Sequence, residues 1–214
     1  MLIRTDYPSI RKAMRPGDVI AFGGKGHFSE VIKWATRAAT SHVGIVLQSK
    51  IVHDGSVQDG FLNQIIESTS LNGFSGVAIN RVSDRLFAYD GEVWWLPLSD
   101  EVRAKMDHKK FYNFLLHQEG KPYDTPQAVY AGLDALDRTA GLTHNQEDFG
   151  KFFCSELAAA GLEEAGAIPH VNASEITPID LCMFRIYRQD YYQIKGPEKP
   201  IRGFNTLDPA GWGE

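Results

Sequence analysis

The sequence predicts an α+β protein in which an antiparallel sheet or small barrel packs against helices. Short apolar segments separated by Gly, Asn, Asp and Ser are typical of antiparallel strands. Apolar residues at helical spacing become prominent in the second half of the chain. The expected strands are residues 19–22, 42–47, 51–53, 63–68, 76–79, 92–96 and 184–194. One helix is expected to begin at Ser29, and three others to cover residues 101–117, 126–139 and 153–165.

The length favours one compact domain. A chain of 214 residues lies near the upper end of what a single core organises. We expect this domain to cover residues 1–195. Residues 196–214 are rich in Pro and Gly and read as an extended C-terminal tail, in which Phe204 and Trp212 indicate local docking.

Composition excludes several classes of partner. The chain is 43% hydrophobic and 23% charged, as ordinary globular proteins are. A formal net charge of −5 without a Lys/Arg cluster argues against nucleic acid. No apolar run approaches the roughly 18 residues of a membrane span. The first residues carry charge and a proline, so we expect no cleaved signal peptide, which favours the cytoplasm without fixing the location. The oligomeric state is not indicated.

Cys154 begins the helical stretch FFCSELAAAGLEEAG. Unpaired backbone amides and the helix dipole at such a position favour a thiolate, which suits a nucleophile. Leu157 and Ala158 lie three and four residues further on, so the cysteine shares the apolar face of the helix. The same position suits an ordinary core cysteine. Helix position alone leaves both interpretations open.

His42 stands at the start of the apolar strand SHVGIV. On a period of two, His42, Gly44 and Val46 share one face, and Gly44 leaves room for a close neighbour. The helix that carries Cys154 is a candidate for that neighbour. A histidine at the start of a strand is often only a polar residue whose ring is hydrogen-bonded and which has no functional role. Its pairing with a cysteine is what predicts a functional role.

A Cys-His pair needs a third group that holds the imidazole in the correct tautomer. Glu67 is the leading candidate because it ends the apolar segment QIIE, and a neighbouring strand would bring its carboxylate to His42. An edge carboxylate without a role is the plain alternative. The other candidates for this third group are Gln64, His53 and Asp54.

No metal or cofactor is expected. The histidines and carboxylates show no HExxH-type spacing, and the two cysteines form no CxxC pair. The glycines of residues 23–26 lack the Lys-Ser/Thr ending of a phosphate-binding loop. Cys182 has no basic neighbour in the sequence and is expected in the core.

These residues together resemble the circularly permuted branch of the NlpC-like papain-fold peptidases, often called YiiX-like or YaeF-like. The resemblance rests on the segments RPGDVI, SHVGIV, IIES, GKPY, FCSEL and TPIDL. His42 precedes Cys154, which is the order that the permutation implies. The resemblance implies a papain-like core, with the cysteine helix packed on the sheet that carries the histidine. It also implies that Tyr123 lies beside the nucleophile, binding substrate or contributing to the oxyanion contacts.

The function that this resemblance implies is that of a cysteine peptidase or amidase, a thiol hydrolase. His42 would help to generate the Cys154 thiolate, which attacks an amide or ester carbonyl, and Glu67 would orient the imidazole. The alternatives are a lipid acyl hydrolase or acyltransferase of the same fold, and a non-catalytic binding module. The expected partner is a peptide or an acylated small molecule. Glu156 stands where cell-wall members commonly have Gly, so the substrate class stays open.

Overall fold

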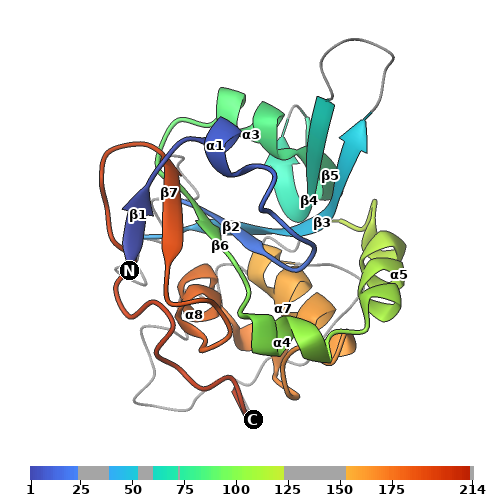
Figure 1. Ribbon diagram of the computed structural model, residues 1–214. Helices are drawn as coiled ribbons and strands as arrows, with labels where there is room; N and C mark the ends of the chain where they lie inside the picture. The colour runs from blue at the N-terminus through green and yellow to red at the C-terminus, as the bar shows by residue number, and fades with distance from the viewer. Residues whose placement is uncertain (24–38, 53–59, 72, 123–152, 213–214) are drawn as a thin grey trace.

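The fold is described by a computed structural model for residues 1–23, 39–52, 60–71, 73–122 and 153–212. It is a mixed α+β structure, as expected, in which one sheet has helices on both of its faces (Figure 1). The strands are β1 (Leu2–Arg4), β2 (Val19–Phe22), β3 (His42–Val52), β4 (Gly60–Leu71), β5 (Phe74–Arg81), β6 (Val93–Leu96) and β7 (Tyr191–Lys195). The helices are α1 (Tyr7–Ile10), α3 (Val82–Ala88), α4 (Asp100–Lys105), α5 (His108–Gln118), α7 (Cys154–Glu164), η1 (Ala173–Glu175, a 3₁₀ helix) and α8 (Pro178–Met183).

Within the described ranges the strands form an open sheet of order β1-β7-β6-β2-β3-β4-β5. Neighbouring strands are antiparallel except for β1, which pairs with β7 in parallel. The prediction left two forms open, an antiparallel sheet or a small barrel, and the described strands form an open sheet. The sequence analysis missed β1, a three-residue edge strand too short to show a period of two.

Four strands differ from the prediction by more than one residue. β4 and β5 extend at both ends beyond the predicted residues 63–68 and 76–79, because the added residues also pair with a neighbouring strand. Residues 42–52 form the single strand β3, because the polar residues 48–50 continue to pair with β4 after a bulge between Val46 and Gln48. The predicted strand 184–194 shortens to β7. The residues before β7 are not part of the strand, because the Phe184 amide donates to the Asp180 carbonyl of α8 and the Arg185 amide donates to the Leu207 carbonyl.

The helix predicted at residues 101–117 is divided into α4 and α5. Asp107 ends the continuity because its Oδ1 accepts hydrogen bonds from the amides of Lys109 and Lys110, both at 3.0 Å, and so caps α5. The helices predicted from Ser29 and at residues 126–139 lie outside the described residues. In the parts of the chain that are described, no helix has the length and apolar character needed to cross a membrane.

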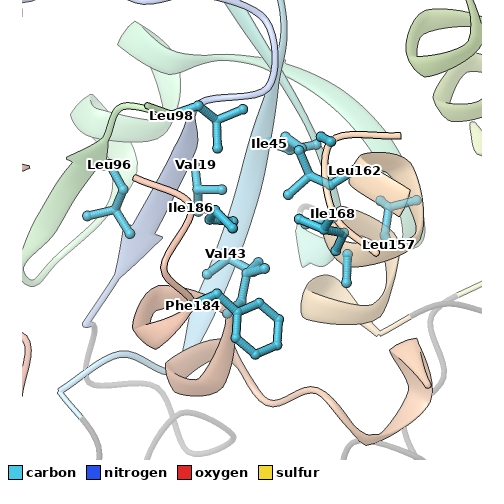
Figure 2. Packing of buried hydrophobic residues seen from close by; sticks show 14 of the residues in the cluster. Val19, Val43, Ile45, Leu96, Leu98, Leu157, Leu162, Ile168, Phe184 and Ile186 are labelled. Atoms are coloured by element: carbon cyan, nitrogen blue, oxygen red, sulfur yellow. The ribbon is translucent and has the colours of Figure 1, made fainter. Parts of the chain in front are cut away.

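The main core lies between the sheet and α7. Val43 and Ile45 of β3 face Leu157 and Leu162 of this helix, as Figure 2 shows. Alternate residues of a strand point to opposite faces. Ile20, Phe22, Val46 and Ile65 accordingly form a second, smaller core with Val82 on the side of α3. His42 and Gly44 alternate with Val43 and Ile45, so they belong to the α3 side of β3.

Asp18 secures the start of β2, which pairs with β3. Its buried carboxylate accepts hydrogen bonds from Trp95 Nε1 and the Leu98 amide, each at 3.0 Å, and from the Arg15 amide at 2.8 Å. Arg103 completes the cluster as an ion pair. Burial raises the pKa of the Asp18 carboxyl in spite of these partners. The RPGD turn thus fixes the central strands on which the site is built.

The tail after β7 folds back on α8. The Trp212 ring lies 5.5 Å from the Phe184 ring, and the Phe204 ring lies 4.2 Å from that of Tyr191. The Trp212 carbonyl accepts the amide of Asn172, just before η1. The two aromatic residues that the sequence singled out are therefore contact points of the tail.

Candidate active site

Cys154 is the first residue of α7 and is only 1% exposed. The helix begins there because the Glu156 carboxylate accepts the amide of Phe153, the residue before the first turn, at 3.2 Å. α7 packs on β3 and β4. The thiol therefore lies at the positive end of a helix dipole, beside the strands that carry the other two candidate residues.

His42 is the first residue of β3, and its side chain is 14% exposed. The ring lies 5.3 Å from that of Phe22 and is in hydrogen-bond contact with Cys154. Its Nε2 lies 2.6 Å from Glu67 Oε2, which leaves Nδ1 to face the thiol. Cys154 and His42 are each the first residue of the element that carries them, and their side chains interact at this point.

Glu67 lies on β4 with its side chain fully buried. Ile45 pairs with Ile66, so His42 and Glu67 are diagonal neighbours on one face of the two strands. The structure thus brings Cys154, His42 and Glu67 together, although they are far apart in the sequence.

The expected role of Gly44 was wrong in one respect. A Cβ at this position would lie 3.0 Å from Ile65 Cδ1 and 3.3 Å from Glu67 Cβ. The space left by Gly44 is therefore occupied by side chains of β4. The cysteine helix packs on the opposite face of β3, because the period of two identifies residues that share a face but not the element that covers it.

Two residues that the sequence analysis missed complete the surroundings of Glu67. Arg85 of α3 places Nε 2.7 Å from Oε1 and donates from its NH2 group to Oε2 at 3.2 Å. Asn80 of β5 donates to Oε1 at 2.9 Å. Ala78 pairs with Glu67, so the strand alternation could have placed Asn80 on the same face. No sequence signal marked Arg85, because an arginine in a short helix reads as a surface residue.

The charges of this cluster are mutually stabilised. Burial lowers the pKa of His42, but the Cys154 thiolate and the Glu67 carboxylate outweigh it and raise that pKa to about 9. Burial alone would raise the pKa of Glu67. Its contacts with His42, Arg85 and Asn80 instead hold the pKa below the ordinary value. The arrangement therefore favours the imidazolium form of His42 and the ionised form of the Glu67 carboxylate.

The other candidates for the third group do not lie against His42 where they are described. The Gln64 side chain accepts a hydrogen bond from Gln48. His53, Asp54 and Tyr123 lie outside the described residues. Among the residues that the structure describes, no group of three or more His, Cys, Asp or Glu side chains is arranged to hold a metal ion.

Cys182 lies in α8 and is fully buried, as expected for a core residue. Burial raises the pKa of its thiol to about 12, although a hydrogen bond with Thr40 acts in the opposite direction. This thiol stays protonated at neutral pH. The two cysteines thus occupy chemically different environments.

The chain was compared with known proteins. No family model matches the sequence, and no curated protein matches it. The structure is similar to the crystal structure of metalloprotein YiiX from Escherichia coli O157:H7, with 17% sequence identity and a TM-score of 0.45. The match covers 71% of this chain and 66% of that one, so it spans slightly less than two thirds of the neighbour. A likeness of this degree assigns neither a family nor an activity.

Proposed function

We propose that the protein is a cysteine hydrolase that cleaves an amide or ester bond through an acyl-enzyme on Cys154. One observation carries this proposal: a helix-initial cysteine contacts a histidine whose second ring nitrogen lies 2.6 Å from a buried glutamate. This is the arrangement of nucleophile, base and orienting group that thiol hydrolases require.

Acylation begins with the thiolate and the imidazolium. Cys154 Sγ forms a bond to the substrate carbonyl carbon, and the carbonyl electrons move to its oxygen. When they return, the bond to the leaving amine or alcohol breaks, and His42 Nδ1 gives its proton to that group. The products are a thioester on Cys154, the released amine or alcohol, and a neutral imidazole.

Deacylation reverses the role of His42. The neutral Nδ1 accepts a proton from water, whose oxygen attacks the thioester carbonyl and releases the acid and the thiolate. The Cys154 backbone amide, in the first turn of α7, is the oxyanion donor in this proposal, with Tyr123 as a second contributor. An alcohol or amine in place of water would make the same site an acyltransferase, which is the alternative reading for an acylated lipid substrate.

The test is mass spectrometry of the intact protein after exposure to a panel of peptide, amide, thioester and acyl-ester substrates. We expect a mass increase equal to the acyl group, located on Cys154 and absent from Cys154→Ser. Cys182→Ser is the matched control and should acylate normally. A folded protein that forms no adduct with any member of the panel and does not react with acyl-type thiol probes would instead be the non-catalytic binding module.

A further inference from the structure

Arg85 is the one described cation besides His42 that contacts the Glu67 carboxylate. We propose that Arg85 is a positioning residue that keeps Glu67 ionised, and thereby fixes the tautomer of His42, during the step in which His42 is neutral. This inference rests on the proposed hydrolase function for its place in the reaction. Its structural content concerns the charge state of Glu67 and can be tested without turnover.

The fold holds the guanidinium in one place. The Arg85 side chain is 8% exposed, and its Cζ lies 5.1 Å from the centre of the Phe22 ring and 5.8 Å from that of Tyr89. Lys195 of β7 donates from Nζ to the carbonyls of Leu86 and Tyr89, both at 2.5 Å, and so fixes the end of α3. The guanidinium that contacts Glu67 is thus enclosed by two aromatic rings, on a helix whose end is hydrogen-bonded to β7.

The titratable and polar groups that contact the His42–Glu67 pair come from three elements, with a further thiol on α8 behind Cys154. Cys154 of α7 contacts the His42 ring, and Cys182 of α8 lies near Cys154 as a neutral thiol. Arg85 of α3 and Asn80 of β5 contact Glu67. Of these groups Arg85 alone carries a guanidinium, the side-chain cation that proteins do not deprotonate.

The charge of Arg85 matters after acylation. Cys154 is then a neutral thioester and His42 has given up its proton, so the imidazolium no longer stabilises the Glu67 carboxylate. A fully buried carboxylate beside a neutral imidazole and an amide would take up a proton, because burial disfavours its charged form. The Arg85 guanidinium at 2.7 Å prevents this.

Protonation of Glu67 would leave His42 in the wrong tautomer. A carboxylic acid donates its proton to Nε2, which places the remaining imidazole proton on Nδ1. Nδ1 could not then accept the proton of the attacking water. An ionised Glu67 instead accepts from Nε2–H and leaves the Nδ1 lone pair free. Arg85 therefore supports deacylation, whereas the resting ion pair needs it less because His42 is then charged.

The test uses the full chain labelled with ¹⁵N-histidine in a Cys154→Ser background, which removes the thiolate as acylation does. Two-dimensional ¹H–¹⁵N spectra report the tautomer and titration of His42, assigned by comparison with His42→Ala. When residue 85 is the native Arg, or is changed in Arg85→Lys, we expect the neutral His42 ring to be the Nε2–H tautomer. With Arg85→Gln or Arg85→Met, we expect the Nδ1–H tautomer. Two neutral variants are used, so that one can be measured if the other does not fold.

The kinetic counterpart uses any substrate that acylates Cys154. Arg85→Gln should keep the initial burst and slow deacylation by about 100-fold, the lower range of what general base catalysis contributes. Arg85→Lys should recover most of this loss. A folded neutral variant with the Nε2–H tautomer and an unchanged titration would overturn the inference. Failure of Cys154 to acylate would refute the proposed function but leave the spectroscopic result to decide the role of Arg85.

Discussion

Replacement of Glu67 by Gln removes the charge of the orienting group and keeps its shape. The pKa of His42 stands at about 9 against an ordinary 6.5, a difference worth about 3 kcal/mol in favour of the imidazolium. The Cys154 thiolate is the larger favourable contribution and Glu67 the second. An opposite charge at this distance raises a pKa by about 1–3 pH units. We therefore expect the His42 pKa to fall by about 1–2 in Glu67→Gln.

The measurement is the alkylation rate of Cys154 by iodoacetamide as a function of pH. A less stable imidazolium stabilises the thiolate less, so the pH of half-maximal reactivity should rise by about 1–2 in Glu67→Gln. The rate at slightly acidic pH should fall by about 10- to 100-fold, while the alkaline plateau should stay the same.

A second effect of this substitution must be separated from the first. Glu67→Gln leaves the buried Arg85 without its anion, and breaking a buried ion pair in this way costs about 3–5 kcal/mol of stability. The double variant Glu67→Gln/Arg85→Met is the matched control, because it removes both charges. It should regain much of the free energy of unfolding in urea while retaining the altered alkylation profile. A folded single or double variant whose profile coincides with that of the wild type would refute the electrostatic role of Glu67.

Three further predictions concern neighbouring features. Thiol-specific reagents at neutral pH should label Cys154 and leave Cys182 intact, since the pKa of Cys182 is raised to about 12; peptide mapping that finds Cys182 labelled first would reverse the assignment. The raised pKa of His42 contributes stability that is complete below about 6.5 and is lost as the pH rises through about 9, so the melting temperature should fall across this window. If the melting temperature of His42→Ala falls in the same way across this window, the loss of stability belongs to another titrating group. Gly44→Ala should cost about 1–3 kcal/mol in urea unfolding and slow Cys154 alkylation, because its methyl group would press on Glu67 Cβ at 3.3 Å; a loss of stability with unchanged alkylation would limit Gly44 to packing.

The candidate site was predictable where a local pattern marks it. Cys154 begins an apolar helix and His42 begins an apolar strand, and each signal lies within a few residues of the group itself. Glu67 was found from the apolar segment before it, although the expectation that it ends the strand was wrong: β4 continues to Leu71 because these residues still pair with β5. Asn80 needed the strand register, which the sequence analysis did not work out. Arg85 could not be found, because its burial depends on an ion pair with a residue of another strand, and such a pair leaves no periodic trace.

The fold shows the same division between local and distant causes. The strands β2 and β6 were predicted within one residue because they are short apolar runs, fully buried on both faces. The division between α4 and α5 had a visible signal in Asp107, a good N-cap residue, which the continuous helical pattern obscured. The short β1 depends on its pairing with β7, far along the chain, and has no local signature.

The distribution of the site along the chain has a consequence for how the protein matures. His42, Glu67, Asn80 and Arg85 all belong to the successive elements β3, β4, β5 and α3, whose pairings join neighbours in the sequence. Local contacts of this kind form early in folding, because they close short loops. Cys154 comes from a distant segment and meets His42 only when α7 docks. Under the proposed function, a molecule in which α7 has not docked would carry a thiol without its base, and would not attack carbonyl groups on itself or on its neighbours.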